Sequence, residues 1–317
     1  IGSILTNGKA GLIDLNLVKK QKLLRASAYP YLLVDYGLLY ISAAPSQGQS
    51  LDEVRKLIIN EIENLKKGNF DDDLLPSIVN NFKKDVIQDA ETYSGRANML
   101  MRAFTSKIDW RDQVAYVNDI QKITKKDIVD FANKYFGDNY VAVYKKKGER
   151  TDVEKIEKPA ITPVETNAGK QSEFVKQIQA MPSTPVAPVF LDYNKDMQKG
   201  KLGKAEVLYV QNKDNDLFRL NFRYKMGSLN DLKMAVAAQY IQFLGTDKKS
   251  AEQISKEFYK IASSFRVTTN EEYTYVTIEG LQENFQAAVA LYEDLVLHAK
   301  VDEQALQSLK ARIAKYR

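Results

Sequence analysis

The chain contains one histidine, His298, and no cysteine, so the residues that most often bind catalytic zinc are almost absent. A catalytic zinc ion takes three protein ligands from His, Cys, Asp and Glu, and usually at least one of them is His. His298 lies late in a predicted helix, on one face with Leu291 and Leu295, where the helix dipole favours an imidazolium. We therefore interpret His298 as structural and predict no catalytic or metal-binding residue in this chain.

Three consecutive carboxylates, Asp71 to Asp73, are the other candidate for metal chemistry. A calcium loop of the EF-hand type needs a central glycine and a bidentate glutamate at its twelfth position, and neither follows here. Acidic residues at the start of a helix complement the helix dipole, which explains the triplet. The sequence also lacks a glycine-rich phosphate loop and a Ser/His/Asp set.

Tyr29 and Tyr31 alternate in a predicted strand and allow two interpretations. They form either a pair that contacts a substrate or part of the packing of a sheet. We favour the second interpretation, because aromatic residues at alternating positions are typical of strands. The substrate-binding residues stay unknown.

The composition is that of a globular protein, with 44% apolar and 27% charged residues among 317. This length favours two domains. The basic excess of five charges is dispersed apart from Lys145 to Lys147, which argues against nucleic-acid binding. There is no apolar run of about 18 residues and no signal-peptide pattern, so no membrane span is expected. The chain begins at Ile1 and ends inside a helical pattern, and we expect it to be part of a longer protein.

Hydrophobic periodicity predicts strands and helices in two similar series. The first has two strands within 31–43, helices beginning at Ser50 and Asp71, helices near 94–106, 110–120 and 124–136, and a strand at 140–144. A Pro-rich connector with one short helix at 173–181 follows. The second series has strands at 206–210, 217–225, 265–269 and 272–278, and helices at 231–244, 250–263, 283–299 and 302–316. Gly245 is predicted to end its helix with a positive φ. Strand pairs that alternate with helix pairs indicate one α+β module used twice.

Several loose blocks resemble the pitrilysin or insulinase (M16) family of zinc metallopeptidases, and together they span nearly the whole chain. They are Leu5–Leu17, Asp35–Ala43, Pro188–Tyr193, Phe218–Ser228 and Phe243–Thr246. Members are clamshells of repeated α+β domains that enclose a chamber for unfolded peptides. Their catalytic domain carries an inverted His-x-x-Glu-His helix and a more distant glutamate, which bind zinc and supply the general base.

The resemblance implies that the metal-binding residues are replaced here. The two histidines of the motif fall at Val236 and Tyr240, and its glutamate falls at Gln239. The distant glutamate falls near Lys315 and Tyr316. None of these side chains can perform the zinc chemistry, so we expect this chain alone to be inactive.

By this resemblance, the fold is α+β with two modules of the LuxS/MPP-like metallohydrolase type, each with a mixed or antiparallel sheet and helices on one face. Residues 1–147 are the C-terminal module of the first half, incomplete at its start, and 148–189 are the linker. Residues 190–317 are the degenerate N-terminal module of the second half, incomplete at its end. Zinc is expected only in a catalytic domain of the parent that is missing from this chain.

The leading hypothesis is a non-catalytic portion of an M16-type zinc endopeptidase that forms chamber wall and hinge. An edge strand is a further place where a peptide could add by backbone hydrogen bonds. The partners are then the remaining domains of the parent and unfolded peptide, with a bacterial periplasmic or cell-envelope location. The alternative is a non-peptidase M16-like structural or partner subunit. Nucleic-acid binding is a third class, which predicts affinity that falls steeply with salt.

Overall fold

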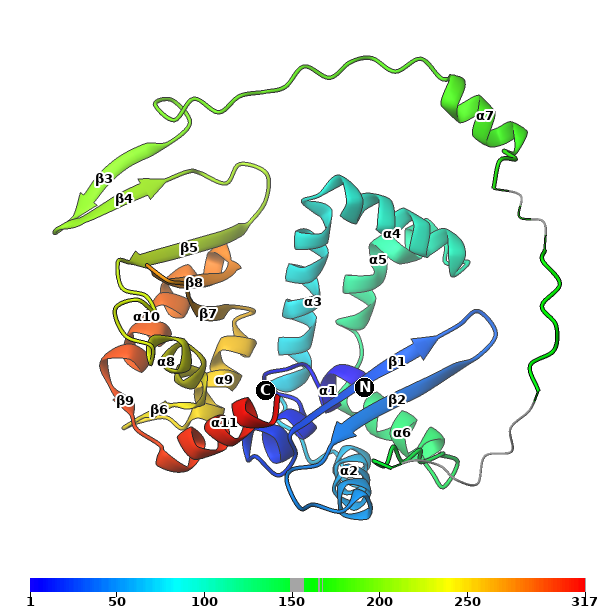
Figure 1. Cartoon of the computed structure of the whole chain (residues 1–317), viewed down its shortest axis with the longest axis horizontal. Coiled ribbons are helices and arrows are strands. Elements are labelled where there is room, and N and C mark those ends of the chain that lie inside the picture. The colour runs from blue at the N-terminus through cyan, green and yellow to red at the C-terminus, as the bar shows by residue number, and fades with distance from the viewer. Residues whose placement is uncertain (149–156, 165, 167, 317) are drawn as a thin grey trace. The chain divides into compact units, whose positions relative to one another are not determined.

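The computed structural model describes residues 1–148, 157–164, 166 and 168–316, with no description of the side chains at 315 and 316. The chain divides into two compact units (Figure 1). The larger unit combines Ile1–Val143 with Asn212–Arg317, and the smaller one is Tyr144–Gln211. The domain ranges expected from the sequence stay predictions.

The first segment of the larger unit contains a β-hairpin and a series of helices. Strands β1 and β2 pair antiparallel, with Arg25 opposite Ala44 and Leu32 opposite Gly37. The elements in order are α1 (Gly2–Leu5), η1 (Asp14–Lys19), β1 (Arg25–Leu32), β2 (Gly37–Ala44), α2 (Leu51–Lys66), α3 (Leu74–Ala90), α4 (Tyr93–Thr105), α5 (Trp110–Ile120) and α6 (Lys125–Tyr135).

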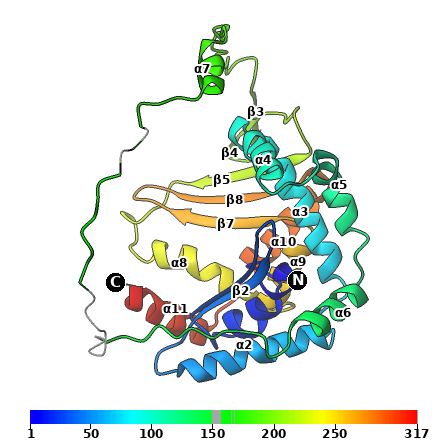
Figure 2. The same cartoon turned by 90° about the vertical axis from the view of Figure 1, so that its right-hand side faces the viewer.

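The second segment is built on a three-stranded antiparallel sheet in the order β5-β8-β7 (Figure 2). Central strand β8 alternates buried and half-buried residues, so the sheet has one core face and one more open face. The elements are β5 (Leu217–Tyr224), α8 (Met234–Tyr240), η2 (Ile241–Phe243), β6 (Gly245–Thr246), α9 (Ala251–Lys260), β7 (Ser264–Thr269), β8 (Thr274–Leu281), η3 (Gln282–Asn284), α10 (Phe285–Leu297), β9 (Ala299–Lys300) and α11 (Glu303–Tyr316).

The described residues of the smaller unit form one helix and one hairpin. Helix α7 spans Glu173–Ala180, and its N-cap Ser172 accepts a hydrogen bond from the backbone of Val175. Strands β3 (Gln198–Leu202) and β4 (Ala205–Tyr209) pair antiparallel.

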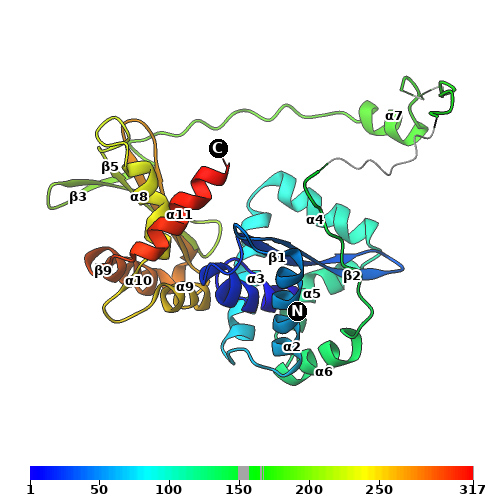
Figure 3. The same cartoon turned by 60° about the horizontal axis from the view of Figure 1, so that its bottom comes forward.

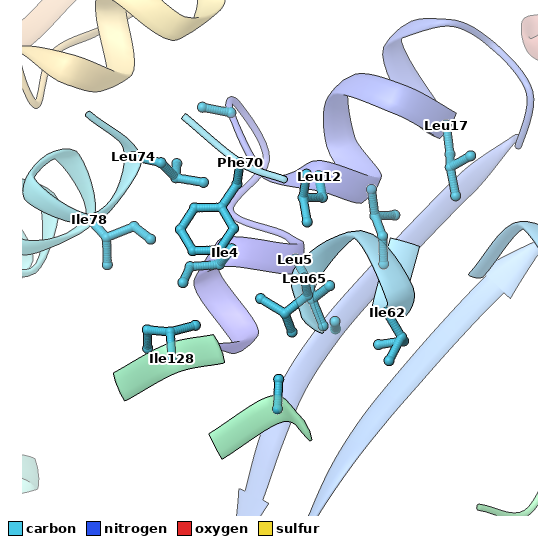
Figure 4. Packing of buried hydrophobic residues seen from close by; sticks show 14 of the residues in the cluster. Ile4, Leu5, Leu12, Leu17, Ile62, Leu65, Phe70, Leu74, Ile78 and Ile128 are labelled. Atoms are coloured by element: carbon cyan, nitrogen blue, oxygen red, sulfur yellow. The ribbon is translucent and has the colours of Figure 1, made fainter. Parts of the chain in front are cut away.

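Two main clusters of buried apolar side chains stabilise the larger unit. In the first segment, α1, α2, α3 and α6 contribute residues around Leu5 and Leu65, both fully buried (Figure 4). In the second segment, α9 and α10 cover the core face of the sheet with Phe258, Leu295 and Ile278 at the centre. Apolar helix faces on one side of an antiparallel sheet constitute an α+β fold, which confirms the predicted class.

Helix boundaries follow the capping signals in the sequence. The Ser250 hydroxyl accepts a hydrogen bond from the backbone amide of Gln253, and the side-chain oxygen of Gln253 accepts one from the backbone amide of Ser250, so the two residues form a capping box. The Ser50 hydroxyl caps α2 by accepting a hydrogen bond from the backbone amide of Glu53. Each cap satisfies amides that a helix leaves unpaired in its first turn.

We expect Ser250→Ala to lower the free energy of unfolding by about 1 kcal/mol, because α9 loses its side-chain cap. Urea unfolding followed by circular dichroism measures the change. Ser106→Ala is the matched control, since Ser106 is exposed and follows the end of α4. Equal stability of the two variants would contradict the role of the capping box.

Two local predictions were wrong. Residues 140–144 form no strand, and Val141 and Val143 are almost fully exposed. Gly245 lacks a positive φ. Helix α8 ends at Tyr240, the chain continues through η2, and Gly245 belongs to strand β6, where it pairs with Lys300. The glycine is required by space instead, since an added Cβ would lie 2.5 Å from the Lys249 carbonyl oxygen.

Candidate functional site

A cleft of about 760 Å³ lies within the larger unit, between residues of η1, the loop before it, and the second segment. Four basic side chains line it, together with one carboxylate, and we call it the cationic cleft. The charged lining residues are Lys9, Lys19, Arg219, Arg266 and Glu279. Its apolar lining includes Ile241, Leu244, Phe258, Phe265 and Val267.

Part of the charged lining comes from the more open face of the sheet. Strand register places Arg219 of β5 opposite Glu279 of β8, and Ser264 of β7 on the other side of Glu279. One position along, Arg266 lies opposite Thr277. Arg219 and Glu279 form an ion pair at 3.2 Å, so neighbouring strands hold these charges at fixed positions.

Lys19 reaches the cleft from the end of η1, a six-residue π-helix. Its ammonium donates a hydrogen bond to the Gln242 carbonyl at 3.1 Å and lies 5.5 Å from the centre of the Phe243 ring. Arg312 lies over the same ring at 4.8 Å. π-Helical turns are frequent at functional sites, and this one places a half-buried lysine in the cleft.

Asp14, at the other end of η1, holds the loop that carries Lys9. One of its carboxylate oxygens accepts hydrogen bonds from the backbone amides of Asn7, Gly8 and Gly11 at 2.7, 2.8 and 3.2 Å. The Ser255 hydroxyl donates to the Lys9 carbonyl at 2.9 Å and joins the loop to α9. The backbone of Lys9 is therefore fixed from both sides.

Burial and the neighbouring charge of Lys9 lower the pKa of Lys19 from 10.5 to about 8. Asp14 opposes this shift, whereas Arg312 adds to it. Between these two pKa values the unfolded chain binds more protons than the folded one, so the free energy of unfolding rises with pH. We expect the free energy of unfolding of the wild type to rise relative to that of Lys19→Met as the pH increases from about 8 to 10.5.

Urea unfolding of both proteins across this pH range measures the difference. The contributions of the other ionisable groups largely cancel in the comparison. Parallel stability profiles for the wild type and the variant would show that the pKa of Lys19 is the same in both states of the chain.

The three positions that the resemblance assigns to the metal motif lie on α8 but do not line the cleft. Tyr240 bonds to the backbone of Asp302, donating to its carbonyl at 2.6 Å and accepting from its amide at 2.8 Å. Gln239 is exposed and Val236 half-buried. Among the residues that line the cleft, α8 contributes Ala238. The side chains of Lys315 and Tyr316 lie outside the described part of the chain.

His298, Tyr29 and Tyr31, which the sequence analysis singled out, are not among the residues that line the cleft. His298 is exposed at the end of α10, with Nδ1 3.0 Å from a carboxylate oxygen of Asp294. Tyr29 packs across the hairpin on Tyr40 with ring centres 5.2 Å apart, whereas Tyr31 is more than half exposed. This contact agrees with sheet packing for Tyr29.

The acidic triplet pairs with three lysines. Asp71 bonds to Lys256 at 2.8 Å and Asp73 to Lys260 at 2.6 Å, and both lysines lie on α9. Asp72 pairs with Lys125 at 2.7 Å. Asp71 and Asp73 thus connect the start of α3 to α9, which Figure 3 shows as neighbouring parts of the larger unit, whereas Asp72 connects it to α6.

Zinc does not fit the residues that are present. Across the described part of the chain, no three side chains of His, Cys, Asp or Glu come together in a metal-binding group. No helix in the same residues has the length and apolar character of a membrane span. The cleft offers cations together with polar and apolar side chains, which suits the binding of an anion.

Sequence reasoning did not identify the cationic cleft. The first and last of its four basic residues, Lys9 and Arg266, are more than two hundred positions apart in the sequence. The alternation of the strand places Arg219 on the open face but does not show which other charged residues lie near it. The signal that was available is the basic pair Lys9 and Lys19 on either side of an apolar segment.

Comparison with known proteins gives one family match and several similar structures. Residues 223–317 match the sequence model of Insulinase (Peptidase family M16). No curated protein matches the chain. A protease from Helicobacter pylori is 27% identical, with 40% of this chain and 31% of that chain covered and a TM-score of 0.38.

Two further solved structures cover most of this chain. The periplasmic protease PqqL from Escherichia coli is 11% identical, with 93% of this chain and 36% of its own covered and a TM-score of 0.32. The ferredoxin protease FusC, solved as a mutant in complex with Arabidopsis ferredoxin, is 12% identical. The match covers 95% of this chain and 37% of the FusC chain, with a TM-score of 0.36. The chain spans about a third of the length of these proteins. The family match agrees with the resemblance found in the sequence: residues 223–317 of this chain are similar to peptidase family M16 (insulinase).

Proposed function

We propose that the chain is a non-catalytic portion of an M16-type zinc endopeptidase, and that it forms chamber wall and hinge for peptide substrates. One observation carries the proposal. The segment that matches the family contains Val236, Gln239 and Tyr240 where the resemblance places the residues of the metal motif. An apolar residue, an amide and a phenol cannot replace two histidines and a glutamate around zinc.

The division of the chain supports the hinge. Residues 144–211 form a compact unit of their own between the two segments of the larger unit. This range contains the Pro-rich stretch whose composition is typical of a linker. A connector with its own contacts suits two halves of a clamshell.

The zinc content of the full-length protein that carries this chain tests the proposal. We expect stoichiometric zinc, cleavage of an unfolded peptide, and loss of that cleavage on treatment with a chelator. The zinc would then be bound by residues outside these 317. A full-length protein without zinc and without peptidase activity would overturn the proposal in favour of a structural or partner subunit.

A further inference from the structure

The lining of the cationic cleft has an unbalanced charge. Four basic side chains face one carboxylate, that of Glu279, and Glu279 already pairs with Arg219. In the part of the chain that the structure describes, no ion pair neutralises Lys9, Lys19 or Arg266. The cleft therefore presents three cations that form no ion pair with a carboxylate among the described residues.

These cations also repel one another. Burial lowers the pKa of Lys9, and the positive charges of Lys84 and Arg266 lower it further. Lys19 loses hydration and faces the charge of Lys9. Like charges at a partly dehydrated site cost free energy, which an anion bound between them would relieve.

The rest of the lining combines polar residues, among them Asn221, Gln242 and Ser255, with an apolar surface. The apolar surface includes Ile241 and Leu244, on either side of the Gln242 carbonyl to which Lys19 bonds. An inorganic ion would leave this surface exposed to water. A ligand with carboxylates next to a large apolar side chain would use both parts. The volume of about 760 Å³ also suits a short segment of chain more than a single ion.

We propose that the cationic cleft binds an acidic segment of peptide, with carboxylates at Lys9, Lys19 and Arg266 and an apolar side chain against Ile241 and Leu244. This inference rests on the proposed function, since a chamber wall meets unfolded peptide. It adds that this wall selects for negative charge. The side chains of Asp14 and Ser255 bond to the backbone of the loop that carries Lys9, so the position of this loop does not require a bound peptide.

A matched pair of fluorescent peptides tests the inference on the unaltered chain. One peptide carries a leucine between glutamates, and the other has glutamine in place of each glutamate. Fluorescence anisotropy should show binding of the acidic peptide about tenfold or more tighter, because bonds between charged partners are stronger than neutral ones. Added salt should weaken only the acidic peptide.

Lys19→Met and Arg266→Gln should each weaken the acidic peptide about tenfold and leave the amide peptide unchanged. Lys122→Met is the matched control, because Lys122 is exposed on a different helix end and pairs with Asp119. We expect that control to bind as the wild type does. Circular dichroism verifies the fold of each variant, and the peptide pair on the wild type decides the question if a variant fails to fold.

Equal binding of the two peptides would overturn the inference. So would full displacement of the acidic peptide by inorganic phosphate at the same concentration, since this would assign the cleft to small anions. Neither result affects the proposed function, which depends on the zinc and the peptidase activity of the full-length protein.

Discussion

Replacement of Phe258 by alanine is expected to lower the free energy of unfolding by about 3 to 5 kcal/mol. Phe258 is 2% exposed and lies on α9 at the centre of the second core. Its ring packs on Phe265 of β7 with ring centres 5.1 Å apart. Alanine removes this packing and leaves a cavity between α9 and the sheet. The folded state therefore loses the free energy gained by burying the ring, and the cavity adds a further cost.

Urea unfolding followed by far-ultraviolet circular dichroism measures this loss. Phe104→Ala is the control, because Phe104 is 85% exposed on α4 and its truncation should change stability by no more than about 0.5 kcal/mol. If the two variants were equally stable, α9 would not cover the sheet through Phe258, and the description of the second core would be wrong.

The second large effect is expected at Asp14. Asp14→Ala should cost about 2 to 4 kcal/mol, because three backbone amides in the loop that carries Lys9 lose their acceptor. The carboxylate is itself buried, at 6% exposure, so water does not readily replace it. The same urea titration measures the effect.

Asp14→Asn separates the acceptor from the charge. The amide oxygen has the same shape and can accept the bonds. Burial raises the pKa of Asp14, since desolvation outweighs the three amide bonds and the charge of Lys19. A neutral side chain is thus expected to cost less than half as much as alanine. Equal losses for both variants would contradict the role of the oxygen as an acceptor for the loop.

Local signals in the sequence predict much of the fold. The capping residues Ser50 and Ser250 mark the helix starts that the structure shows, and the alternating residues of 217–225 predict β5. These signals are reliable because they are local. A helix cap is a hydrogen bond between residues a few positions apart, and a strand with one buried face shows apolar residues at every second position.

Other features depend on contacts between distant parts of the chain. The apolar pattern at 140–144 is typical of a strand, but a strand exists only where a neighbour supplies hydrogen bonds. The π-helix at η1 and the loop held by Asp14 depend on amides that no periodicity reveals. The cleft likewise forms only when the sheet and η1 meet, which explains why sequence reasoning identified Val236, Gln239 and Tyr240 but not Lys9 or Lys19.

The central claim is that this chain contributes no metal chemistry. Its most direct test is to incubate the purified chain with zinc, remove free metal, and measure bound zinc and hydrolysis of an unfolded peptide. We predict no retained zinc and no cleavage, because the positions that the resemblance assigns to the metal motif hold Val236, Gln239 and Tyr240. Stoichiometric zinc, together with cleavage that a chelator abolishes, would contradict this account.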